Sequence, residues 1–343
     1  MRKSTRFAAV ALIATFGLVA AACGDDEESS SETTGAPAAS ITAGVAFDTG
    51  GRGDGTFNDS AAAGADRAKT ELGIDIKELE ANVDEDRQAN LELLAEDGRN
   101  VIIGVGFMFT DPMTTVAAQY PDITFGIVDS VVDAPNVRSL VFAEQEGSFL
   151  VGAAAALKCE CDKIGFIGGQ EIDLIKKFEA GYTAGAKYIN PDIEVLVKYL
   201  GPAGDNSAWG NVAGAKEIAS GWYADGVEVV YTAAGGSGAG TVEAAIEAGK
   251  WAIGVDSDEW VTRGGDAQKV ILTSMLKRVD VAVFETIKAV ADGDTSGGIK
   301  VFDLSVDGVG YATSGDYLTD FIDQLEEIKA KIIAGEIEVP TAP

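Results

Sequence analysis

From residue 41 onward, short apolar runs alternate with segments in which apolar residues recur at helical spacing. Residues 41–47 and 101–105 are almost continuously apolar, as is typical of buried strands, whereas residues 60–72 place small and apolar side chains every three or four positions. Strands and helices that alternate in this way predict parallel sheets with helices on both faces.

The alternation starts again near Lys163, which predicts two lobes of the same kind. No obvious linker separates the two halves, so we expect several crossings between the lobes. In the first half, further strands are expected at 74–80, 123–128 and 137–141, and helices at 84–97, 111–119 and 146–157. In the second half, strands are expected at 163–167, 193–199, 227–231, 251–255, 270–273, 300–304 and 309–312, and helices at 173–188, 212–224, 240–247, 279–291 and 317–334.

Length and charge narrow the class of protein. The 343 residues fit two domains of roughly 150 residues each. Lys and Arg number 26 against 55 Asp and Glu, and the net charge of −29 disfavours nucleic acid, anionic membrane surfaces and free polyphosphates as partners. The chain contains no histidine, which excludes Ser-His-Asp triads and His-ligated zinc. We expect no catalytic residue, no metal and no cofactor.

The N-terminus has the pattern of an export signal. Arg2, Lys3 and Arg6 precede a short apolar run over residues 7–22. Cys23 follows three alanines, as at the cleavage site of bacterial lipoproteins, where the cysteine is lipidated. The alternative is an ordinary secretory signal with a bystander cysteine. Residues 23–40 are rich in Asp, Glu and Ser and are expected to form a solvated tether.

The two remaining cysteines, Cys159 and Cys161, flank a single glutamate. They could form a local disulfide outside the cytoplasm, or remain two thiols near the surface. Neither interpretation gives them a catalytic role.

Three expected strands are followed directly by aspartates, Asp48, Asp129 and Asp256. Ligands of parallel sheets bind beyond the carboxyl ends of the strands, and a carboxylate there can accept hydrogen bonds from hydroxyl pairs and N–H edges of a neutral polar ligand. The alternative is that each aspartate caps the helix that follows its strand. Both interpretations stay open for the sequence alone.

A glycine-rich loop after the first strand ends in Phe57 and Asn58. Its glycines let the backbone approach a ligand closely. Phe57 could cover the core at a helix start or offer a flat face to a ring, and Trp209, in a polar loop of the second half, has the same two interpretations. If both rings faced one ligand they would sandwich a planar base, with stacking worth about 1–3 kcal/mol per base.

Two further candidates lie in the second half. Gly235 and Gly236 open a glycine cluster between a strand and a helix, so their amides could meet a ligand oxygen. Lys277 comes just after an expected strand and is either a ligand-binding cation or an ordinary surface lysine.

Eight segments together resemble the basic membrane protein family of bacterial lipoproteins, the purine-nucleoside-receptor-like substrate-binding components of ABC transporters. Segment 142–150 reads FAEQEGSFL and segment 277–283 reads KRVDVAV. The others are 48–58, 126–130, 164–169, 177–182, 233–238 and 253–256, so the resemblance runs through nearly all of the chain beyond residue 40.

The resemblance implies an α/β fold of the periplasmic-binding-protein type I kind, with two doubly wound parallel-sheet lobes, a multi-strand hinge and a ligand held in the cleft. After a signal peptide (1–22) and a tether (23–40), we expect a first lobe of 41–143 plus 257–298. The second lobe is expected to comprise 144–256 plus 299–343.

By the same resemblance, Phe57 would stack on a nucleoside base, and Asn58 and Asp129 would bond the edge of the base. The second stacking position matches Trp209, where many relatives carry Phe. A wider indole still stacks, so base binding is expected while the preferred base stays open.

The resemblance also implies which residues hold the ribose of the nucleoside. Asp256, an amide near Gly235 or Gly236, and Lys277 would hold its hydroxyls, and Asp48 lines the same loop as Phe57.

The expected role is a monomeric, lipid-anchored receptor on the extracytoplasmic face of the cell membrane, which captures a nucleoside, with a purine favoured, and delivers it to an ABC permease. The alternatives are the same clamp with another ligand, such as a sugar or a flavin, or a sensor without transport. An exported glycosidase acting through Asp48 and Asp129 is disfavoured because no clear acid/base pair is present.

Overall fold

The computed structural model describes residues 41–159 and 161–343. The expected signal peptide, the tether and the lipidation of Cys23 lie outside the described residues. Within the described ranges, no helix is both long enough and apolar enough to cross a bilayer.

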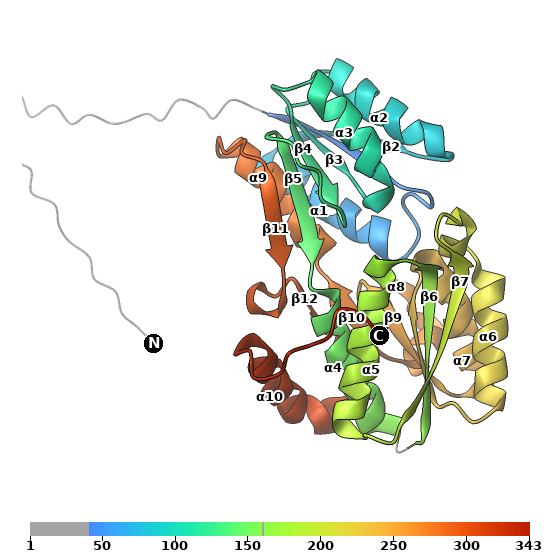
Figure 1. The fold of residues 1–343 in the computed structure, drawn as a ribbon. Coiled ribbons are helices and arrows are strands. Elements are labelled where there is room, and N and C mark those ends of the chain that lie inside the picture. Colours follow the sequence, from blue (N-terminus) through green and yellow to red (C-terminus); the bar gives the residue numbers. More distant parts are fainter. Residues whose placement is uncertain (1–40, 160) are drawn as a thin grey trace, which may run out of the picture. The chain divides into compact units, whose positions relative to one another are not determined.

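Six parallel strands form the first sheet, in the order β11-β5-β4-β3-β1-β2 (Figure 1). They are β1 (Thr42–Phe47), β2 (Asp75–Glu80), β3 (Val101–Gly104), β4 (Thr124–Val128), β5 (Val137–Phe142) and β11 (Gly298–Phe302). Strands β3 and β4 are buried along their whole length, which explains their apolar sequences.

Helices cover both faces of this sheet. On one face lie α1 (Phe57–Leu72) and α9 (Val279–Ala291), which share a buried apolar cluster with the β1 residue Val45. On the other lie α2 (Asp84–Glu96) and α3 (Thr110–Gln119), which share a second cluster with the next β1 residue, Ala46. Neighbouring residues of one strand therefore point into different apolar layers, as the pleat requires.

The second sheet has the order β12-β10-β9-β8-β6-β7. Its strands are β6 (Lys163–Glu171), β7 (Glu194–Pro202), β8 (Val229–Ala233), β9 (Trp251–Asp256), β10 (Ile271–Lys277) and β12 (Val309–Tyr311). All pairings are parallel except that of β12 with β10. Two parallel-dominated sheets flanked by helices confirm the expected fold class.

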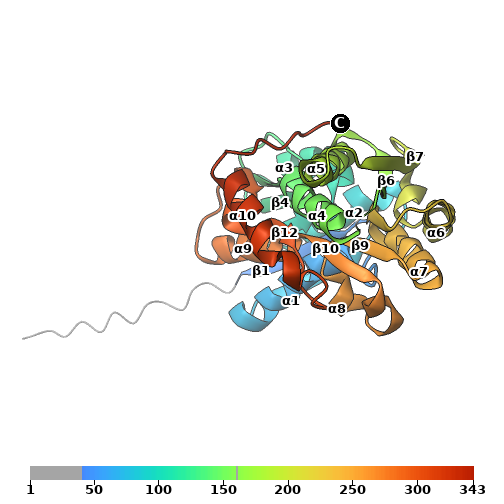
Figure 2. The same ribbon diagram turned by 90° about the horizontal axis from the view of Figure 1, so that it is seen from below.

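The helices of the second lobe also form two layers (Figure 2). One layer holds α4 (Glu144–Cys159) and α5 (Asp173–Ile189), with α10 (Ile322–Ile333) packed beside α4. The other holds α6 (Val212–Ala224) and α7 (Gly238–Ala248). A short helix, α8 (Glu259–Arg263), follows β9 and was not expected from the sequence.

The chain crosses between the lobes after β5, after β10 and after β11. The crossings are tied together, since the Ala143 amide donates to the Phe302 carbonyl at 3.0 Å and the Arg278 amide donates to the Gly308 carbonyl at 2.9 Å. The aromatic rings of Phe142 and Phe302 stack at the same place with centroids 5.1 Å apart. Three adjacent crossings form the expected multi-strand hinge.

The expected lobe boundaries need two corrections. Residues 257–298 were assigned to the first lobe, but β10 lies within them and pairs with β9 in the second sheet. Residues 299–343 were assigned to the second lobe, but strand β11 at Gly298–Phe302 pairs with β5 in the first sheet. An apolar run shows that a segment is a strand, and it carries no information about which of two similar sheets the strand joins.

The sulfur atoms of Cys159 and Cys161 are joined in a disulfide at the end of α4. Of the two interpretations left open by the sequence, the structure has the local bridge.

Helices α4 and α5 approach each other closely because glycines lie at their contact. A Cβ added at Gly181 would overlap the backbone carbonyl of Gln145, and a Cβ at Gly185 would overlap that of Phe149. Glycine is therefore required here by packing, although it lowers helix propensity.

We predict that Gly185→Ala lowers the free energy of unfolding by about 1–3 kcal/mol, because the new methyl group forces the two helices apart. Gly221→Ala is the matched control, since Gly221 lies inside α6 and a Cβ there meets nothing within 4 Å. The control should raise stability by about 0.5–1 kcal/mol. Urea unfolding of both variants measures the difference, and equal effects would contradict the packing argument.

Candidate ligand-binding site

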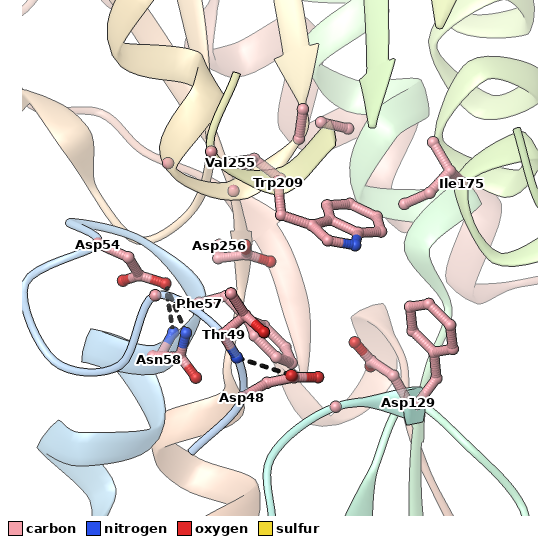
Figure 3. A pocket seen from close by; sticks show the side chains of 18 of the residues that line it. Asp48, Thr49, Asp54, Phe57, Asn58, Asp129, Ile175, Trp209, Val255 and Asp256 are labelled. Carbon is pink, nitrogen blue, oxygen red and sulfur yellow. Dashed lines mark hydrogen bonds between the residues drawn. The ribbon is translucent and has the colours of Figure 1, made fainter. Parts of the chain in front are cut away.

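The carboxyl ends of strands from both sheets meet at one pocket of about 240 Å³ (Figure 3). This is where parallel sheets bind ligands. All nine residues expected from the sequence to contact ligand line it, namely Asp48, Phe57, Asn58, Asp129, Trp209, Gly235, Gly236, Asp256 and Lys277. The structure thus brings the whole expected set together, although the set comes from segments more than 200 positions apart.

The three aspartates stand at equivalent strand ends. Asp48 follows β1, Asp129 follows β4 and Asp256 ends β9. Asp129 and Asp256 both have φ 64°, a left-handed conformation that aspartate tolerates better than most residues. Within the described residues, none of the three carboxylates accepts a hydrogen bond from the first turn of the next helix. The helix-cap interpretation of these aspartates is therefore wrong.

A fourth aspartate, Asp54, performs the capping role at the start of α1. Its carboxylate accepts hydrogen bonds from the backbone amides of Thr56, Asn58 and Asp59 at 2.9–3.2 Å, and α1 consequently begins at Phe57 rather than near residue 60. It also accepts a bond from Asn58 Nδ2 at 3.1 Å, so the side-chain nitrogen of Asn58 is occupied while Asn58 Oδ1 has no partner in the described chain.

Phe57 and Trp209 each combine the two roles left open by the sequence. Both pack partly against the main apolar core and both line the pocket. Trp209 ends a single turn of 3-10 helix, Asn206–Trp209, and meets Phe107 of the first lobe edge-on with ring centroids 6.2 Å apart. The pocket therefore has an aromatic side chain from each lobe, which is the arrangement expected for holding a flat ring.

Lys277 is buried, with only 2% of its side chain exposed, so the surface-lysine interpretation is wrong. Its ammonium lies 2.5 Å from Asp129 Oδ2 and 4.0 Å from Glu144 Oε1, and 4.9 Å from the centre of the Phe57 ring. Burial disfavours the charged ammonium, but these carboxylates and that of Asp256 outweigh it and raise the pKa of Lys277. The lysine is charged at neutral pH.

The carboxylate of Asp256 lines the pocket without a hydrogen-bond partner among the described residues. Burial raises its pKa to about 7; Lys277 opposes that shift and the negative charge of Asp129 adds to it. A buried carboxylate without a donor is energetically costly, so this group is suited to accept hydrogen bonds from hydroxyl groups of a ligand.

Asp48 is held by a residue that the sequence analysis missed. Its Oδ1 atom accepts bonds from Arg87 Nε at 2.9 Å and Nη2 at 2.6 Å, and Arg87 is only 3% exposed. Burial raises the pKa of Asp48 although Arg87 opposes the shift. Only the other carboxylate oxygen, Oδ2, is left for a ligand.

Much of the apolar wall of the pocket was not expected from the sequence. The additional large lining side chains are Phe107, Met108, Leu174, Ile175, Phe178, Val212 and Val255. Most of them occupy positions that sequence periodicity assigns equally well to the core. An aspartate shortly before a helix is a recognisable capping signal, so the role of Asp54 could have been predicted. Nothing in the sequence around Arg87 indicates that its side chain is buried.

The pocket is an apolar slot with polar groups at defined places. Its lining contains four carboxylates, those of Asp48, Asp54, Asp129 and Asp256, and one ammonium. In the part of the chain that the structure describes, no three or more His, Cys, Asp or Glu side chains are grouped so that they could hold a metal ion. Such a site can bind a neutral molecule that has an aromatic ring and several hydrogen-bond donors.

The raised pKa of Asp256 has a consequence for stability. Because its pKa is higher in the folded than in the unfolded chain, the folded state binds this proton more tightly, and the contribution of Asp256 to the free energy of unfolding falls as pH rises from about 4 to about 7. We predict that Asp256→Asn removes on the order of a few kcal/mol of that decline.

Urea unfolding at a series of pH values measures this decline in the wild type and in the variant. Asp192→Asn, at an exposed position, is the control and should keep the wild-type slope. Identical slopes for wild type and Asp256→Asn would show that Asp256 titrates normally.

Comparison with known proteins supports the fold and the class of binding site described above. Residues 41–342 match the family described as ABC transporter substrate-binding protein PnrA-like. The chain is 34% identical to the CD4+ T-cell-stimulating antigen of Listeria monocytogenes over 100% of both chains. It is also 34% identical to the ABC transporter nucleoside-binding protein BmpA of Lactococcus lactis, over 98% of this chain and 99% of that protein.

Solved structures agree on the fold. An ABC transporter solute-binding protein from Aeropyrum pernix K1 superposes with a TM-score of 0.75 at 31% identity, over 88% of this chain and 93% of that one. A carbohydrate solute-binding protein from Agrobacterium radiobacter, in complex with D-arabinose, has a TM-score of 0.58 at 18% identity, over 84% and 99% of the two chains.

Substrate-binding proteins of ABC transporters bind a small molecule and deliver it to a permease, which is a non-enzymatic role. With its two-lobed fold, its pocket at the strand ends and a match over residues 41–342, this chain belongs to the family of PnrA-like ABC transporter substrate-binding proteins.

Proposed function

We propose that this substrate-binding protein captures a nucleoside, with a purine favoured, and delivers it to its ABC permease. The observation that carries the proposal is the combination, in one pocket, of aromatic side chains from both lobes with a buried carboxylate and a buried ammonium. A nucleoside fits this combination, because its flat heterocycle complements the aromatic side chains and its sugar hydroxyls complement the carboxylate and the ammonium.

The base would lie against the aromatic groups. The Lys277 ammonium lies over the Phe57 ring, 4.9 Å from its centre, and both Phe57 and Trp209, which comes from the other lobe, line the pocket. Asn58 Oδ1 and Asp129 Oδ1 are buried acceptors without partners in the described residues. An unsatisfied buried acceptor costs about 1–3 kcal/mol, so N–H groups on the edge of a base would gain by pairing with them.

The sugar would lie toward Asp256 and Lys277. A carboxylate accepts bonds from two neighbouring hydroxyls, while an ammonium donates to their oxygens. The backbone near Gly235 and Gly236 also lines this part of the pocket, and Gly235 has φ 54°, which favours glycine there.

The charge of the pocket favours a nucleoside over a nucleotide. Four lining carboxylates surround a single lysine, and that lysine is already paired with Asp129. A phosphate group would meet net repulsion in a site of low dielectric constant.

The relative named nucleoside-binding protein BmpA supports the ligand class. Relatives in Pyrococcus abyssi and Pyrococcus horikoshii are named lipoproteins, which supports the proposal that Cys23 carries a lipid and holds a monomeric receptor on the extracytoplasmic face of the cell membrane.

Isothermal titration calorimetry with adenosine, guanosine, inosine, uridine and cytidine tests the ligand class. We expect saturable binding of at least one purine nucleoside, tighter than that of either pyrimidine, and much weaker binding of the corresponding 5′-monophosphate. Binding of free ribose with no nucleoside bound would favour a sugar receptor. Absence of binding for all five nucleosides would remove the proposal.

We predict that Trp209→Ala weakens nucleoside binding at least tenfold, about 1.4 kcal/mol, because one stacking face is lost. Trp209→Phe is the matched control, since it keeps a flat ring at that place, and should retain affinity within about threefold. Calorimetry measures both variants. Equal losses in the two would assign to Trp209 a packing role without stacking.

A further inference from the structure

The pocket carboxylate Asp48 connects through Arg87 to a contact between the two lobes. Arg87 donates to Asp48 Oδ1 with Nε and Nη2 and to Asp84 Oδ1 with Nη1 at 2.7 Å. Asp84 Oδ1 in turn accepts a bond from Asn206 Nδ2 of the second lobe at 2.9 Å. One guanidinium therefore joins a ligand-facing acid to an interlobe hydrogen bond.

The second-lobe side of this contact is held in place by a buried side chain. Gln170, which is 1% exposed, donates from Nε2 to Asn206 Oδ1 at 3.0 Å and accepts a bond from the Gly204 amide at 2.9 Å. Because both ends of the Asn206 amide group are bonded, its nitrogen is oriented toward Asp84. Asn206 also begins the 3-10 turn that ends in Trp209.

In the strand order of the two sheets, the contact between Asp84 and Asn206 lies at the edge away from the hinge. Asp84 begins α2, which follows β2, and Asn206 follows β7; β2 and β7 are the edge strands opposite β11 and β12, beside which the chain crosses between lobes. A hydrogen bond at this edge acts at the open side of the clamp, where separation on opening is greatest.

We propose that Asp84 and Asn206 form a latch that slows ligand release, with Arg87 as the positioning residue that couples the latch to the pocket. The latch holds the Trp209 turn against the first lobe in the closed state. Asp84 is 72% exposed, so the bond is weak enough to be broken when the ligand is handed over.

The kinetic test rests on the proposed nucleoside function and uses stopped-flow tryptophan fluorescence with inosine and guanosine. Asp84→Ala and Asn206→Ala should each raise the dissociation rate constant about three- to tenfold, with little change in the association rate constant. The double variant should show no further increase, because both changes remove the same bond.

Two further variants separate the latch from a general effect of charge or folding. Glu85→Ala removes an exposed acid from the same turn of α2 and should leave release unchanged. Asn206→Asp places two carboxylates against each other and should speed release more than Asn206→Ala does. Additive effects in the double variant, or an equal effect of Glu85→Ala, would overturn the latch.

A ligand-independent measurement keeps the two proposals apart. Spin labels at Leu93→Cys of α2 and Ile246→Cys of α7, both exposed and in different lobes, report the interlobe distance by electron–electron double resonance. If no nucleoside binds the wild type, the proposed function fails. The latch then stands if Asp84→Ala shifts the ligand-free distances to longer values, and falls if they are unchanged.

Discussion

The buried ion pair between Lys277 and Asp129 is the interaction on which the site depends. The lysine ends a strand of the second sheet and the aspartate follows a strand of the first, so the pair fixes the two lobes at the base of the pocket. A single ammonium also makes it possible to bury Asp256 and Glu144 nearby. Removing one partner of such a pair typically costs 3–5 kcal/mol, because a charge is then left buried alone. The same concentration of acids is the reason why we propose an uncharged ligand.

The contacts between the two lobes differ in strength between the hinge side and the opposite edge of the clamp. Three adjacent crossings and a continuous apolar core join the lobes on one side, while the exposed hydrogen bond between Asn206 and Asp84 joins them on the other. In the proposed mechanism, ligand contacts from both lobes add to the weak edge contact and shift the population toward the closed state. This division suits a carrier, since the strong contacts preserve the geometry of the pocket and, in our proposal, the weak contact sets how quickly it opens.

The fold and most polar groups of the site could be predicted from the sequence, whereas their pairing could not. Parallel strands buried on both faces leave a strong apolar signal, and aspartates at their carboxyl ends are conspicuous, so Asp129 and Asp256 were found. The burial of Lys277, the Arg87 partner of Asp48 and the sheet joined by β10 depend on contacts between distant segments. Local patterns do not contain that information; for Lys277, only the resemblance to a family pointed to the pocket.

The most direct measurement is a crystal structure of the chain purified without added ligand, at a resolution that defines whatever occupies the pocket, with mass spectrometry of the released molecule. The account predicts a planar heterocycle between Phe57 and Trp209, with ring hydroxyls on Asp256 and Lys277. A bound molecule without an aromatic ring, or one that leaves Asp256 and Lys277 uncontacted, would contradict it.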